Sequence, residues 1–193
     1  MHAPTRRPAT LADLLALPDG ERFHEILDGE LVRKAGPSFE HGNAQSGVIA
    51  NVRVAFQRPP GSGGPGGWWI VTEVEVALAS DEVPRPDVVG WRRERLPEKQ
   101  TQFPVAVRPD WICEIVSPNR AADDTVKKVR AYHRARVPYY WLLDLRDGTL
   151  TVLEWSEAGY VVALKAERHE HVQARPFEAI GLEVGALFGD DPT

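Results

Sequence analysis

The stretch Trp111-Ile112-Cys113-Glu114-Ile115-Val116 is almost wholly apolar, yet it carries one carboxylate, Glu114. A short apolar run that ends in turn residues, here Ser117-Pro118-Asn119, is typical of a strand buried on both faces. A glutamate inside such a strand is costly unless it is paired with a cation or binds a metal. The stretch therefore predicts a central buried strand whose glutamate has either a structural Arg or Lys partner or a functional role.

A second carboxylate stands at the start of another apolar run, Asp87-Val88-Val89-Gly90-Trp91. Pro86 favours an extended entry into this strand, so Asp87 is either an ordinary strand-end aspartate or a partner for Glu114. Two carboxylates on adjacent strands, with a lysine nearby, can hold a divalent metal against a phosphate. This arrangement points to a metal-dependent phosphodiesterase, most simply a nuclease.

The lysine is supplied by a predicted helix over residues 121–136. Asp124, Lys128 and Tyr132 follow one another at intervals of four, which places them on one helix face. A surface salt bridge beside a core tyrosine would explain this spacing. Alternatively, Lys128 leans toward the two carboxylates and stabilises charge that develops on a phosphate, while Asp124 holds the lysine in place.

The net charge of −5 argues mildly against a general nucleic-acid coat, but the charge is uneven along the chain. Basic residues outnumber acidic ones in the same predicted helix. They form either a solvated helix face or a phosphate-facing rim around the acidic site. The candidates for nucleic-acid contact are Arg120, Lys127, Arg130 and Arg134.

Hydrophobic periodicity and turn residues predict an α/β (mixed α+β) fold with a mixed central sheet flanked by helices. A capping box at Thr10 predicts a short helix, and Asp28-Gly29 predicts a hairpin. We expect a flexible segment over 1–9, one domain over 10–188 and a tail over 189–193. Strands are expected at 23–27, 31–34, 68–78, 87–91, 111–116, 139–145, 150–155 and 160–164, and helices at 10–17, 40–56 and 121–136.

Several classes of protein are excluded by composition. No apolar run approaches the roughly 18 residues of a membrane span, and no apolar secretory segment is visible near the N-terminus. The single cysteine excludes an intrachain disulfide and a cysteine-based zinc cluster. A cytoplasmic location follows by default. Trp68-Trp69 follows a glycine-rich loop, and aromatic exposure there would indicate a homodimer.

Two further polar residues, His41 and Glu25, are weaker candidates for the site. His41 opens the helix over 40–56 and is either structural, exposed or part of the site. Glu25 is either an outward-facing residue of the first hairpin or an additional acidic ligand. Glu73 and Glu75 share one face of the strand over 68–78, which we expect to be solvated.

The order of these motifs resembles the Uma-two family of restriction-endonuclease-like nucleases, over about 10–188. The matching segments are Phe-His-Glu25-Ile-Leu-Asp28-Gly29, His41, Arg85-Pro86-Asp87, Cys-Glu114-Ile-Val-Ser117-Pro118, Asp124-x3-Lys128-x3-Tyr132, Val137-Pro-Tyr-Tyr-Trp141 and Phe177-x3-Gly181-Leu182.

The resemblance implies a PD-(D/E)XK fold and cleavage of nucleic-acid phosphodiesters with Mg²⁺ (or Mn²⁺). We expect the nucleic acid to be DNA. Asp87 and Glu114 would be the metal-binding acids, together with the carbonyl of Ile115, and Lys128 would assist. In the PD-(D/E)XK superfamily, to which the Uma-two family is assigned, a basic residue normally stands two positions after the second acid. This chain has Val116 at that position, so Lys128 would take the place of the basic residue. The alternative is a catalytically inactive nucleic-acid-binding or protein-interaction module on the same fold.

Overall fold

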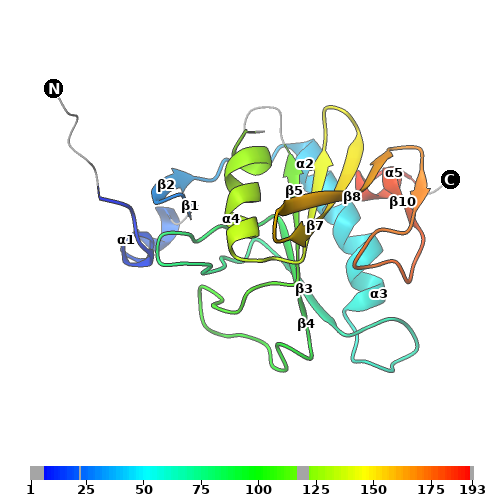
Figure 1. Cartoon of the computed structure of the whole chain (residues 1–193), viewed down its shortest axis with the longest axis horizontal. Helices are drawn as coiled ribbons and strands as arrows, with labels where there is room; N and C mark the ends of the chain where they lie inside the picture. Colours follow the sequence, from blue (N-terminus) through cyan, green and yellow to red (C-terminus); the bar gives the residue numbers. More distant parts are fainter. Residues whose placement is uncertain (1–6, 22, 117–121, 192–193) are drawn as a thin grey trace.

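The computed structural model describes residues 7–21, 23–116 and 122–191 and centres on a six-stranded sheet (Figure 1). The strand order is β3-β4-β5-β6-β7-β8. Only β5 and β6 are parallel, and every other neighbouring pair is antiparallel, so the sheet is mixed, as predicted. The strands are β3 Trp68–Thr72, β4 Val88–Arg92, β5 Trp111–Val116, β6 Tyr139–Asp144, β7 Thr149–Ser156 and β8 Gly159–Glu167.

The strand β5 is completely buried and has the predicted bounds. Its antiparallel register with β4 pairs Val88 with Cys113 and Gly90 with Trp111. One step further along this register, Asp87 comes level with Glu114. The pairing of two apolar strands therefore sets the two carboxylates side by side.

Helices cover both faces of the sheet (Figure 1). One face packs against a continuous helix made of α2 Phe39–Val48, the π-helical turn η2 Ile49–Arg53 and α3 Val54–Phe56. An aromatic cluster of Trp111, Trp141 and Phe177 fills the core there. The π-helical segment η3 Asp123–Lys127 and α4 Lys128–Arg134 follow β5, and Tyr132 of α4 packs on the opposite face.

Smaller elements lie at the two ends of the molecule (Figure 1). At one end, α1 Leu11–Leu15 packs on the hairpin of β1 His24–Leu27 and β2 Glu30–Arg33. The Asp13 carboxylate accepts the backbone N–H of Thr10 at 2.8 Å, as expected for the capping box. The other elements are η1 Asp19–Glu21, β9 His171–Val172, β10 Leu182–Glu183 and α5 Val184–Leu187.

The strand predicted over 68–78 is too long, and the predicted solvated face is wrong. Strand β3 ends at Thr72 because Glu73 adopts a positive φ of 56°, which a regular strand cannot accommodate. Beyond this bend the chain enters the protein, and Glu75 is only 1% exposed. Glu73 is half-buried and has cationic partners.

Two further expectations are changed by the structure. The last predicted helix ends at Arg134, and Arg136 takes a positive φ of 58°. Trp68 is buried, with 2% exposure, so the aromatic pair offers less open surface than expected. Among the described residues, no helix is both long and apolar enough to cross a bilayer.

Candidate active site

Asp87 lies at the centre of the polar cluster, directly before β4, and is 2% exposed. Its Oδ2 accepts the backbone N–H of Ile115 at 2.7 Å, and its Oδ1 lies 2.8 Å from Nζ of Lys34. His41 Nε2 approaches the same Oδ1 at 3.3 Å. The carboxylate is therefore held from both sides by fixed groups.

Glu114 is fully buried on the side of the sheet that faces α4. Its Oε1 accepts the Tyr132 hydroxyl at 2.6 Å and lies 3.1 Å from Nζ of Lys128. The other oxygen, Oε2, accepts the backbone N–H of Asp87 at 3.4 Å. Lys128 also lies 3.5 Å from Oε2 of Glu25, which is itself 2% exposed.

The structure thus brings together six residues that the sequence singles out for catalytic or accessory roles. His41 is one of them, and the other five are Glu114 and four residues around it. Asp87, Glu114 and Lys128 lie in one connected network, and Glu25 and Tyr132 extend it. Glu25 is not an outward-facing residue, because its Oε2 accepts the backbone N–H of Arg85 at 3.2 Å inside the protein. Catalytic roles for these residues stay predictions.

Three members of the cluster were not among the sequence candidates for the site: Lys34, Gln45 and Glu73. Nζ of Lys34 contacts Glu73 at 2.9 Å and the Arg85 carbonyl at 2.8 Å, in addition to Asp87. The amide nitrogen of Gln45 donates to Glu73 at 3.1 Å and to the Asp87 carbonyl at 2.8 Å. A signal for Gln45 did exist, because it stands one helical turn after His41 on the same face of α2.

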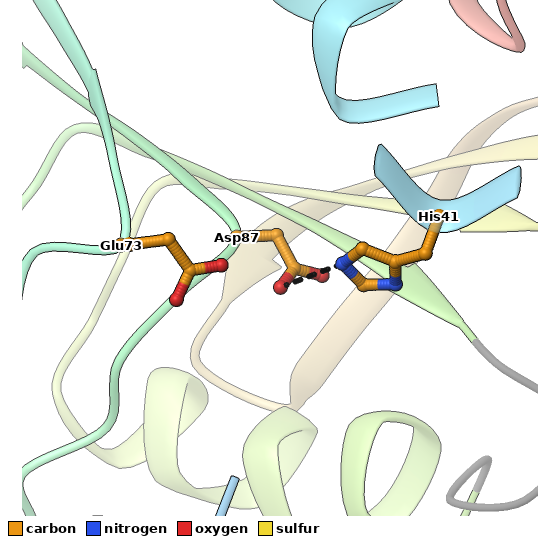
Figure 2. Close-up of side chains that lie close together, drawn as sticks. All are labelled: His41, Glu73 and Asp87. Carbon is orange, nitrogen blue, oxygen red and sulfur yellow. Dashed lines mark ion pairs between the residues drawn. The ribbon is translucent and has the colours of Figure 1, made fainter. Parts of the chain in front are cut away.

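The backbone of Glu73 is held in its unusual conformation by hydrogen bonds. Its N–H donates to the Pro86 carbonyl at 3.2 Å, and its carbonyl accepts Nε of Arg85 at 3.0 Å. A non-glycine residue at positive φ costs free energy, and such residues occur preferentially at functional sites. The bend turns the Glu73 carboxylate toward Asp87 (Figure 2).

The donor set of His41, Glu73 and Asp87 fits a divalent cation. One ligand atom from each of the three lies within 4.8 Å of the others. Figure 2 shows the His41 ring pointing from α2 toward Asp87, with Glu73 on the far side of that carboxylate. The Lys34 ammonium already lies within 2.9 Å of oxygens of Asp87, Glu73 and Arg85, so these oxygens can surround a cation. The predicted pairing of Asp87 with Glu114 as metal ligands stays a prediction.

The electrostatics favour an ionised carboxylate at the centre of the cluster. Burial opposes ionisation of Asp87, but Lys34, His41 and Lys128 outweigh it and hold the pKa of Asp87 well below its usual range. Burial likewise opposes the charge on Lys34, yet the nearby carboxylates raise its pKa. Burial and the Glu114 charge raise the pKa of the Tyr132 hydroxyl, which therefore acts as a hydrogen-bond donor.

The predicted nucleic-acid-contacting residues differ in their surroundings. Arg134 is engaged in ion pairs with Asp28 at 2.8 Å and Glu82 at 2.6 Å. Lys127 lies 3.5 Å from Glu30, while Arg130 is exposed. Arg120 and the side chain of Asp124 lie outside the described part of the chain. Contact with nucleic acid stays a prediction for all four basic residues.

Comparison with known proteins places this chain in a family. The family model Uma2, described as "Putative restriction endonuclease", matches residues 11–185. A solved structure, described as "a putative nuclease belonging to DUF820 from Anabaena variabilis ATCC 29413", aligns with a TM-score of 0.72 and 21% identity. The alignment covers 94% of this chain and 98% of that one and confirms the predicted fold. No curated protein matches. Since the family model spans most of the sequence, the chain belongs to the Uma2 family of restriction-endonuclease-like proteins.

Proposed function

We propose that this protein is a metal-dependent endonuclease that hydrolyses phosphodiester bonds of DNA. The observation that carries the proposal is the Asp87 carboxylate, which is buried and fixed at the junction of two polar groups. The carboxylate faces His41 and Glu73, and the backbone N–H of the same residue donates to Glu114 at 3.4 Å. A carboxylate held in this way is preorganised for binding a cation.

In this proposal Asp87 and Glu114 hold Mg²⁺ or Mn²⁺, and Glu73 and His41 complete the site. Carboxylate oxygens suit both Mg²⁺ and Mn²⁺. The chemistry supplied by a cation bound there is polarisation of the phosphate, activation of a water and stabilisation of the leaving oxygen.

The remaining residues prepare these ligands. Ile115 orients Asp87 through its N–H, and Tyr132 orients Glu114 through its hydroxyl. Lys128 is 2% exposed and offsets the charges of Glu114 and Glu25, so its assistance comes through the carboxylates. We expect Lys128→Ala to reduce cleavage less than removal of either Asp87 or Glu114.

The test is cleavage of a panel of DNA and RNA, single-stranded and duplex, with Mg²⁺, Mn²⁺ or EDTA. Activity is expected with either metal, none with EDTA, and losses of orders of magnitude in Asp87→Ala and Glu114→Ala. Added salt should weaken cleavage. Protein contacts to phosphates release counterions from the nucleic acid, and this release becomes less favourable as the salt concentration rises, so the substrate binds less tightly. Activity that survives EDTA or either substitution would refute the mechanism.

One observation favours a second candidate, a nucleic-acid-binding module without catalysis. Lys34 lies on the Asp87 and Glu73 oxygens and neutralises them with a protein cation. A site that keeps this arrangement has no need of a metal. Metal-independent binding of DNA without cleavage of any substrate in the panel would support this second function.

Three other parts of the proposal come from sequence alone: DNA in preference to RNA, a homodimer and a cytoplasmic location. The cleavage panel distinguishes the two nucleic acids. Light scattering at high micromolar concentration tests the dimer, since a strictly monomeric mass would refute it. Fractionation of cells that produce the protein tests the location.

A further inference from the structure

A cavity of about 390 Å³ opens directly beside the polar cluster around Asp87. Its walls come from the hairpin, the segment that connects the hairpin to α2, α2 itself, and the segment between β3 and β4 that carries Glu73 and Arg85. Lys34, His41 and Glu73 belong both to the cavity and to the cluster around Asp87. Resting on the proposed nuclease function, we infer that this cavity binds one unpaired nucleotide next to the cleaved phosphate, so that the substrate is a single-stranded segment.

The charge of the cavity suits a nucleotide phosphate. Among the side chains that line it, Arg33, Lys34 and Arg85 are cationic and Glu73 is acidic. Lys34 is paired with Asp87 and Glu73, and Arg85 with Glu73, so these three cations face two carboxylates. The small local excess of positive charge contrasts with the net charge of −5 of the whole chain. A cationic recess within an acidic protein favours an anionic ligand at this place over other parts of the surface.

An aromatic ring at the cavity gives a surface for a base. Phe23 is 55% exposed, a large apolar area to leave in contact with water. The guanidinium carbon of Arg85 lies 5.8 Å from the centre of this ring, so a cation and a flat apolar face stand together. Bases of single strands stack on exposed aromatic rings and on arginine, whereas bases inside a duplex already stack on one another.

The size of the cavity limits its occupant. Small-ligand sites range from about 300 to 1,000 Å³, and this cavity lies near the lower end. It can admit one base with its sugar, and a double helix is far too wide. An unpaired nucleotide meets this limit and uses the aromatic and cationic walls together.

The position of Lys34 relates the nucleotide to the polar cluster around Asp87. Its ammonium contacts Asp87 and Glu73 while its side chain lines the cavity. A nucleotide stacked on Phe23 would therefore place an adjoining phosphate at the side of the cluster that carries Lys34. The cavity would in this way bind unpaired nucleotides in preference to base-paired ones.

The experiment is a binding titration in EDTA, read by fluorescence anisotropy. The probes are a labelled single-stranded DNA of about 12 nucleotides, the same sequence in RNA, and a blunt DNA duplex. Because this titration measures binding without metal, its result does not depend on whether the protein cleaves nucleic acid. A failure of the nuclease proposal and a failure of this inference can therefore be told apart. Wild type should bind the single strand more tightly than the duplex.

The decisive variant is Phe23→Ala, with Phe103→Ala as its matched control. Phe103 is also exposed, at 45%, but lies between β4 and β5. Loss of one stacked base costs about 1–3 kcal/mol, so single-strand affinity should fall by about 5-fold or more in Phe23→Ala. Duplex affinity, and all affinities of Phe103→Ala, should change by no more than about 2-fold.

Phe23→Leu covers the case in which the alanine variant does not fold. It keeps an apolar side chain without a ring and should lose single-strand affinity in the same direction. If the Phe23 variants lose affinity for single-stranded DNA and RNA alike, the cavity recognises the base and the phosphate. If they lose affinity for single-stranded DNA alone, the cavity also recognises the sugar. Equal losses for single strand and duplex, an equal loss in Phe103→Ala, or no binding of any single strand would overturn the inference.

Discussion

Nζ of Lys34 lies 2.8 Å from Oδ1 of Asp87, so a lysine from the N-terminal hairpin neutralises the buried carboxylate at the centre of the candidate active site. The two residues are far apart in sequence and meet because the hairpin packs beside the start of β4. A divalent cation that used this Asp87 oxygen would compete with Lys34. The contact therefore makes metal binding and the position of Lys34 interdependent.

Removal of this competitor should strengthen metal binding. In Lys34→Met, a tenfold gain in affinity for Mn²⁺ would add about 1.4 kcal/mol of stabilisation, or about 3–5 °C in the metal-induced shift of Tm. Thermal unfolding with and without millimolar Mn²⁺ measures this. Lys165→Met removes an exposed charge from β8 and should keep the wild-type shift. A smaller shift in Lys34→Met than in wild type would show that Lys34 does not compete with the metal.

Asp87 should contribute pH-dependent stability. Because its folded-state pKa is below the usual value near 4, its stabilising contribution is complete above about pH 4 and is lost as the pH falls further. The difference in free energy of unfolding between wild type and Asp87→Asn should therefore be largest near neutral pH. Urea unfolding from about pH 3 to about pH 7 tests the sign. A difference that grows as the pH falls would contradict the ion pairing described here.

The hydroxyl of Tyr132 should contribute more to stability than that of Tyr160. Tyr132 donates to a buried carboxylate at 2.6 Å, whereas Tyr160 donates to the neutral carbonyl of Val137 at 2.8 Å. Tyr132→Phe should cost about 1.5–3 kcal/mol and Tyr160→Phe about 0.5–1.5 kcal/mol, by chemical denaturation. The reverse order would indicate that Glu114 is not charged in the folded protein.

Two glycines of α2 should respond oppositely to alanine. A Cβ on Gly47 would lie 2.5 Å from the backbone oxygen of Ala186, which cannot move without shifting α5. We expect Gly47→Ala to destabilise the protein by about 1–3 kcal/mol. Gly42 has open space around it, so Gly42→Ala should stabilise the helix by up to about 1 kcal/mol. Equal effects of the two substitutions would contradict the close packing of α2 on α5.

Local sequence was sufficient for the sheet and for one half of the site. The apolar run around Glu114 predicts a buried strand, and strand β5 has the predicted bounds. The proximity of Asp87 and Glu114 follows from pairing two such strands. These patterns correctly predicted the mixed α/β fold, and the resemblance of the motifs correctly predicted the family.

The other half of the site depends on contacts that no local pattern encodes. Glu73 alternates with apolar residues like a strand residue, but its positive φ is fixed by hydrogen bonds to the segment before β4. Lys34 ends a hairpin and looks like any exposed strand-end lysine. Its role in the cluster arises only from the packing of that hairpin beside α2 and β4.

The most direct test of the central claim is Mn²⁺-dependent cleavage by Asp87→Ala beside Asp110→Ala. Asp110 is also a buried acid, at 5% exposure. It directly precedes β5, whereas Glu114 lies toward the other end of that strand, and it forms an ion pair with Arg95. On a substrate that the wild type cleaves, Asp87→Ala should lose orders of magnitude in rate and Asp110→Ala should remain within about tenfold of wild type. Wild-type cleavage by Asp87→Ala, or an equal loss in both variants, would contradict an active site centred on Asp87.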